Sequence, residues 1–153
     1  MTVLGIAAGV VEMCCICTAL INSFKILRKF RDNPLEEVVN RLGATMECAL
    51  VILKELEKYE RENTITYRDD STGDWTPIGL NLNVLNDCIR ECKVYLEELE
   101  LKWKLWKLFK GSGIKKKLST INDDLEKAYG TLSVALGTLN IGQFQQLHQG
   151  ILY

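Results

Sequence analysis

Apolar side chains recur at intervals of three and four residues over most of the chain. This is the spacing of core-facing positions on an α-helix, and it predicts four long helices over about residues 2–30, 34–61, 82–109 and 114–142. Asn33 and Pro34 are typical of a helix start, as an N-cap and a first helical residue. Glycines at 111 and 113 break the chain between the last two helices, and Gly142 is expected to end the fourth.

Residues 64–81 lack this periodicity. They contain turn-forming residues between Asp70 and Asp74, and they predict a long connection with a small hairpin or a mobile tip. Short connections elsewhere make their flanking helices antiparallel neighbours. The sequence therefore predicts an all-α, up-down-up-down four-helix bundle over residues 1–142, with a long loop between the second and third helices. Residues 143–153 are expected to form a short C-terminal tail or one further helical piece.

Composition narrows the classes of function. The 153 residues are 47% hydrophobic and carry a formal net charge of -1, which is typical of one soluble globular domain. The single histidine, His148, has no Ser or Cys partner at a defined spacing, and no phosphate-binding loop or metal-ligand spacing is present. We therefore expect no enzyme, no cofactor, no metal and no nucleic-acid partner. The six cysteines include helix neighbours that pair poorly, so we expect reduced thiols in a cytoplasmic protein.

The stretch from Val3 to Ile21 contains a single charge, Glu12, and is close to the length that spans a bilayer. A charge at mid-depth costs about 2.5 to 3.5 kcal/mol on insertion scales, so the segment is marginal for a membrane. Gly5 and Gly9 form a small-xxx-small pair that lets backbones approach closely. Two interpretations stay open: a core helix that is always buried, and a buried helix that can leave the bundle.

The predicted topology gathers basic residues at one end of the bundle. The first, third and fourth helices together contribute eleven of the 19 basic residues there, namely Lys25, Arg28, Lys29, Arg31, Lys102, Lys104, Lys107, Lys110, Lys115, Lys116 and Lys117. Lysines near helix C-termini complement the helix dipole, but that does not explain those at the start of the fourth helix. An anionic lipid surface would be attracted to such an end.

Residues 102–110 alternate lysines with Trp, Leu and Phe. On a helix the lysines at 104, 107 and 110 gather on one side and most of the apolar residues on the other, as in interfacial membrane helices. Trp103 and Trp106 also continue the core-facing pattern of the third helix, so we expect both to pack inward while the lysines point outward.

Two stretches carry a family resemblance. One is the glycine- and alanine-rich opening from Gly5 to Val11, and the other runs from Leu105 through Lys115–Lys117 to Leu136. On these stretches the chain resembles the N-terminal four-helix bundle of the mixed-lineage-kinase-like pseudokinases. It is also similar to the fungal HeLo and HELL cell-death domains and to the plant powdery-mildew-resistance type of coiled coil. The likeness spans nearly the whole chain.

This resemblance implies a non-enzymatic effector of programmed cell death or innate immunity. Such domains oligomerise on a signal from an upstream receptor or kinase and permeabilise membranes, so the expected partners are anionic phospholipid and further copies of the chain. The chain is expected to be cytoplasmic and to move to the plasma membrane on activation. No pseudokinase or nucleotide-binding module follows Tyr153, so we expect an isolated domain or a trigger supplied by another molecule.

The resemblance also implies roles for individual residues. The membrane-inserting set comprises Leu4, Ile6, Val10, Glu12, Ile16 and Leu20, with Glu12 as a pore-facing acid. The lipid-binding set comprises Lys25, Arg28, Lys29, Lys107, Lys110, Lys115, Lys116 and Lys117. The alternative is an adaptor bundle that couples a receptor or kinase to an effector and never touches lipid.

Overall fold

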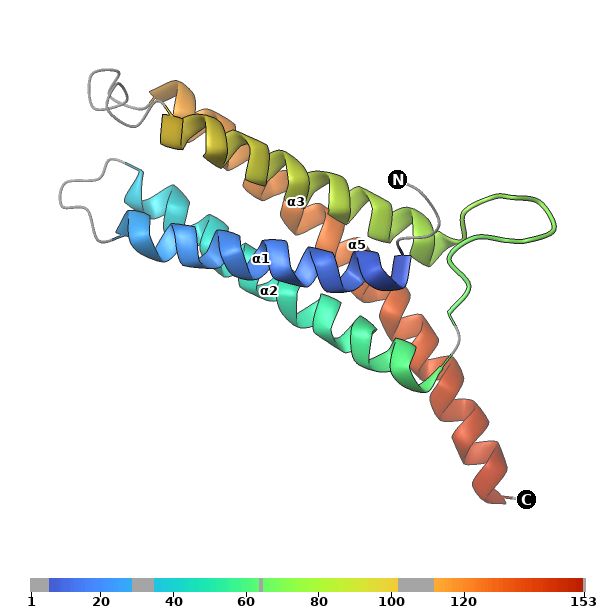
Figure 1. Cartoon of the computed structure of the whole chain (residues 1–153). Coiled ribbons are helices and arrows are strands. Elements are labelled where there is room, and N and C mark those ends of the chain that lie inside the picture. Colours follow the sequence, from blue (N-terminus) through green and yellow to red (C-terminus); the bar gives the residue numbers. More distant parts are fainter. Residues whose placement is uncertain (1–5, 29–34, 64, 102–111, 153) are drawn as a thin grey trace.

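The computed structural model describes residues 6–28, 35–63, 65–101 and 112–152. They form four α-helices: α1 (Ile6–Arg28), α2 (Glu36–Glu62), α3 (Pro77–Leu101) and α5 (Ser112–Leu152). Successive helices run in opposite directions along one bundle, and no strand occurs among the described residues (Figure 1). The all-α, up-down-up-down four-helix bundle is therefore confirmed.

The helices are arranged as two hairpins that lie side by side. α1 packs against α2, α3 packs against α5, and the hairpins meet where α2 contacts α5 and α1 contacts α3 (Figure 1). Within the described residues α1 and α5 lie diagonally opposite each other, as do α2 and α3. The residues between α2 and α3 therefore cross the end of the bundle rather than joining neighbours.

Two helix boundaries differ from those expected. α5 continues without interruption through Gly142 to Leu152, so residues 143–152 are helical and are not a separate tail. Figure 1 shows these last turns extending past the end of α2. α3 begins at Pro77, five residues before its expected start, because the Thr76 hydroxyl accepts a hydrogen bond from the Gly79 amide at 3.2 Å and caps the helix.

The core is built from the apolar stripes that the sequence predicts. Leu42, Leu53, Leu85, Ile89 and Leu125 are fully buried at the centre of the bundle. α1 adds a buried face, α2 contributes nine buried positions between Val38 and Leu56, and α5 contributes residues from Leu118 to Leu136. Burying each such side chain stabilises the fold by roughly 1.5 to 3 kcal/mol.

The α2–α3 connection contains a small hairpin. Arg68 and Trp75 form an isolated antiparallel bridge, and Gly73 occupies the left-handed region with φ of 75° at the turn between them. Asp69 organises the turn by accepting hydrogen bonds from both the amide and the hydroxyl of Ser71. The hairpin expected for this connection is therefore present.

Candidate functional site

Three of the six proposed inserting residues lie on the buried face of α1. Val10, Ile16 and Leu20 lie in the core beside Met13 and Phe24, which are also buried. Ile6 is in the first turn of α1, and Leu4 lies outside the described residues. In this structure Val10, Ile16 and Leu20 therefore stabilise the bundle.

The opposite face of α1 is exposed and carries few charges. Val11 is 46% exposed and Ile26 is 58% exposed, and between them Cys15, Thr18 and Asn22 also reach solvent. Residues Gly9–Ile26 have the length and the mean hydropathy, 1.5, of a membrane-crossing helix, and half of that window is buried. A buried core helix of a soluble protein passes the same test, so the window marks α1 as a candidate and no more.

Glu12 is paired at the surface. Its Oε1 lies 3.1 Å from Nη2 of Arg90 on α3, and the Nε of Arg90 donates a hydrogen bond to Oδ1 of the buried Asn86 at 3.1 Å. The bundle thus neutralises the one acid of the apolar segment through a cation from the other hairpin. No pattern in the sequence indicates this pairing, because Arg90 lies on a different helix.

A groove separates α1 from α3 along their exposed sides. It has a volume of about 340 Å³, and its apolar lining residues are Cys15, Ile16, Ala19, Leu20 and Leu96. Glu12, Lys93 and Glu97 line its edges. α1 packs mainly against α2 and makes fewer contacts with α3. The groove therefore lies along the weaker of the two helix contacts of α1.

The lipid-binding set is only partly described. Lys25 is exposed near the end of α1, and the three lysines Lys115, Lys116 and Lys117 are exposed at the start of α5. The side chain of Arg28 is not among those described, and Lys29, Lys107 and Lys110 lie outside the described residues. The end of α1 and the start of α5, which carry these lysines, lie at the same end of the bundle (Figure 1).

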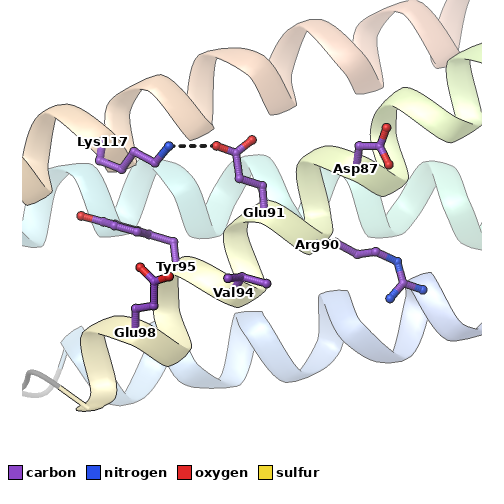
Figure 2. Close-up of a pocket in the computed structure, with 7 residues that line it drawn as sticks. All are labelled: Asp87, Arg90, Glu91, Val94, Tyr95, Glu98 and Lys117. Atoms are coloured by element: carbon purple, nitrogen blue, oxygen red, sulfur yellow. Dashed lines mark hydrogen bonds and ion pairs between the residues drawn. The ribbon is translucent and has the colours of Figure 1, made fainter.

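Lys117 is already engaged by α3. Its Nζ lies 3.0 Å from Oε1 of Glu91, and it is 6.0 Å from the centre of the Tyr95 ring (Figure 2). The hydrogen bond and the charge of Glu91 raise the pKa of Lys117 above its ordinary value. The basic end is also mixed in charge, because Glu36 and Glu37 begin α2 there and Glu97 and Glu98 lie near the end of α3. Most of the lysines and arginines expected at this end lie outside the described side chains, so the cation-rich end stays a prediction.

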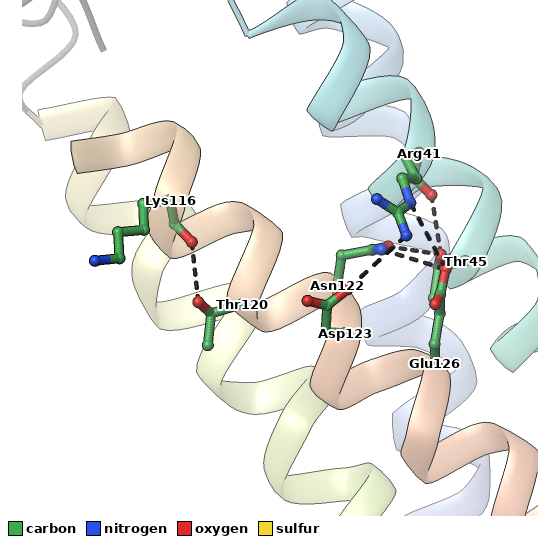
Figure 3. Close-up of polar contacts among 7 residues, drawn as sticks. All are labelled: Arg41, Thr45, Lys116, Thr120, Asn122, Asp123 and Glu126. Atoms are coloured by element: carbon green, nitrogen blue, oxygen red, sulfur yellow. Dashed lines mark hydrogen bonds and ion pairs between the residues drawn. The ribbon is translucent and has the colours of Figure 1, made fainter. Parts of the chain in front are cut away.

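A polar cluster joins α2 to α5 inside the bundle. The Thr45 hydroxyl donates to Oδ1 of Asn122 at 2.6 Å, and Nδ2 of Asn122 donates to Glu126 at 3.3 Å (Figure 3). Arg41 lies 3.9 Å from carboxylate oxygens of both Asp123 and Glu126 at the rim. Asn122 is fully buried, so this contact fixes the register of the two hairpins rather than presenting a binding site.

A second polar contact lies at the opposite end of α2. The phenol of Tyr67, a buried residue of the connection, donates a hydrogen bond to the Glu60 carboxylate. Burial, together with the nearby charge of Glu57, raises the pKa of Glu60 to about 7. A carboxyl group that titrates near neutrality therefore holds the connection against α2.

No group of side chains suited to a metal ion occurs among the described residues. The six cysteines are unpaired, and burial raises the pKa of Cys17 and of Cys92 to about 12, which disfavours the reactive thiolate. These buried thiols act as small apolar side chains of the core.

Comparison with known proteins found no matching family, no matching curated protein and no matching solved structure. The family resemblance of the two sequence stretches therefore stays an expectation. The functional candidates within the described residues are α1, its boundary with α3 and the lysines at the end of the bundle.

Proposed function

We propose that this chain is a non-enzymatic bundle that self-associates and binds or permeabilises anionic membranes in a cell-death or defence response. The observation that carries the proposal is α1: a helix of membrane-crossing length and apolarity that lies at the side of the bundle with only half of its apolar window buried. Its single acid is held by a surface ion pair, which costs little to break.

The physical basis is a transfer of the buried face of α1 from protein to lipid. Val10, Ile16 and Leu20 would keep an apolar environment in a bilayer, so leaving the bundle does not expose them to water. The bundle loses that contact area, and the membrane replaces it. Lys25 and Lys115–Lys117 support the approach, since each lysine near an anionic surface contributes roughly 1 kcal/mol.

Dye release from vesicles tests this function. Full-length protein is mixed with vesicles of phosphatidylcholine alone and with vesicles that also contain phosphatidylserine. We expect release from the anionic vesicles, weakening as salt rises because headgroup attraction is screened. A chain that leaves both vesicle types intact, even when forced to oligomerise by a fused dimerisation domain, would refute the proposal.

The alternative is an adaptor that binds partner helices and never touches lipid. The groove of about 340 Å³ between α1 and α3 favours it, because its lining is largely apolar and open to solvent. Sedimentation with anionic vesicles separates the two functions: an adaptor stays in the supernatant at every salt concentration, whereas a membrane effector pellets at low salt.

A further inference from the structure

The outward side of α3 carries three exposed apolar side chains. Leu80, Val84 and Val94 are 52%, 52% and 53% exposed, and no described helix covers them. Val84 follows Leu80 by four residues, and Val94 follows Val84 by ten. At about 3.6 residues per turn these intervals place all three on one side of the helix. Asp87, Glu91 and Glu98 share that side, so we call these six residues the α3 face.

The acids of the α3 face are not all neutralised. Glu91 is bonded to Lys117, but Asp87 and Glu98 form no ion pair within the described part of the chain. Arg90 and Lys117 line the adjacent groove of about 450 Å³. Arg90 is paired with Glu12, and Lys117 is paired with Glu91 (Figure 2). The face therefore presents apolar side chains flanked by negative charge.

The chain itself contains the complementary chemistry. Residues 102–110 hold four lysines interleaved with two tryptophans, two leucines and a phenylalanine. The face that these nine residues would cover, from Val84 to Val94, extends roughly 15 Å along α3. The same chain cannot deliver the segment there, because the segment follows Leu101 directly and only residue 111 would be left to return to Ser112.

We propose that the α3 face binds residues 102–110 of a second copy of the chain. Leu105, Leu108 and Phe109 of that segment cover Val84 and Val94, and its lysines pair with Asp87 and Glu98. The α3 face and residues 102–110 are different surfaces, and each copy carries both. The contact is therefore heterologous, and successive copies can add to form a ring or an open chain. The inference rests on the proposed function, because it names the surfaces through which the proposed self-association occurs. Lipid plays no part in the contact.

Sedimentation velocity in the absence of lipid tests the contact. We expect the full chain to self-associate in a concentration-dependent way and to dissociate as salt rises. Val94→Lys places a cation on the face and should weaken association by about tenfold or more, since like charges meet across the contact. The matched control is Val51→Lys, at an equally exposed valine of α2, 57% exposed, which should leave association unchanged.

A mixing experiment makes the contact specific. Lys102→Gln/Lys104→Gln changes lysines outside the lipid-binding set and should also give monomers. Mixed with the Val94→Lys chain it should form a one-to-one complex that grows no further, because one intact face then meets one intact segment. Circular dichroism establishes that each variant is folded.

Each negative result has one meaning. A full chain that is monomeric at its highest soluble concentration, or association that Val94→Lys leaves unchanged, would overturn the inference. Association through the face without dye release would instead remove the proposed membrane function. Dye release combined with association that Val94→Lys leaves unchanged would remove the inference alone.

Discussion

Glu12 on α1 and Arg90 on α3 are joined across the boundary between the two hairpins, with 3.1 Å between Oε1 and Nη2. Arg90 is itself positioned by the buried Asn86, whose Oδ1 accepts from its Nε. The side chains of the pair are 57% and 43% exposed, so water competes for both. Exposed ion pairs of this kind contribute about 0–1 kcal/mol to the stability of a fold. The Glu12–Arg90 pair therefore adds little to the attachment of α1 to α3.

Replacing Glu12 by Gln separates the two roles of this residue. We expect the free energy of unfolding to fall by less than about 1 kcal/mol, because the lost ion pair is exposed. Dye release from anionic vesicles should increase, because an ionised side chain no longer enters the apolar phase. Glu47→Gln, at an exposed acid of α2, is the control and should change neither. Unchanged or lower release by Glu12→Gln would contradict the insertion of α1.

The Thr45–Asn122 contact predicts strong non-additivity. Thr45→Val leaves Oδ1 of the fully buried Asn122 without its 2.6 Å donor and should destabilise the bundle by about 1–3 kcal/mol. Thr45→Val combined with Asn122→Leu removes both polar groups and should cost less than the sum of the single changes. Urea unfolding of the four chains in this cycle measures the coupling, and strict additivity would contradict it.

Two glycines predict opposite effects of the same substitution. A Cβ at Gly79 would lie 2.1 Å from the backbone oxygen of Tyr67, so Gly79→Ala must displace the connection from α3 and should destabilise by about 2 kcal/mol or more. Gly130 is in the middle of α5 with nothing within 4 Å of its would-be Cβ. Gly130→Ala should therefore stabilise by about 0.5–1 kcal/mol through helix propensity. Thermal unfolding of both variants provides the measurement.

Glu60 predicts a pH dependence of stability. Its pKa is raised from 4.5 to about 7 in the folded chain, so the folded state binds more protons than the unfolded state between these values. The stability it contributes is complete below pH 4.5 and is lost as the pH rises through about 7. Urea midpoints of the wild type should thus fall between pH 5 and 8, relative to Glu60→Gln. Asp69, with a lowered pKa, acts only at more acidic pH and does not obscure the comparison.

The thiols predict an order of chemical modification. Cys15 and Cys48 are exposed, whereas Cys17 and Cys92 are buried with pKa values of about 12. An aromatic disulfide reagent at pH 8 should label the first pair rapidly and the second pair only at the rate of unfolding. Rapid labelling of Cys17 in the folded chain, followed by mass spectrometry, would indicate that α1 leaves the bundle without lipid.

The periodic positions could be predicted from sequence, and the contacts between helices could not. Val38, Leu42, Met46 and Leu53 are buried as the three-and-four spacing of α2 requires. Asn122 precedes two aspartates and looks like a surface residue, yet it is fully buried because Thr45, 77 positions away, supplies its partner. Asn33, the expected cap, lies outside the described residues; α2 begins at Glu36, and Leu35 is at the cap position with no side-chain cap hydrogen bond.

The placement of the lysines shows the same limit. Helix directions follow from connection lengths, and the end of α1 and the start of α5 lie at one end of the bundle (Figure 1). Whether that end is cationic depends on which acids share it, and the Lys117–Glu91 pair arises only because α3 and α5 pack together. A count of lysines along the sequence contains no information on such neutralisation.

The diagonal crossing of residues 63–76 has a consequence for how the chain folds. Each hairpin is assembled from segments close in sequence, so its contacts have low contact order and form early. The seams between α2 and α5 and between α1 and α3 join distant segments, and they form last. Docking of the two preformed halves is then expected to be the slowest step, and mutations in the seams should slow refolding as well as accelerate unfolding.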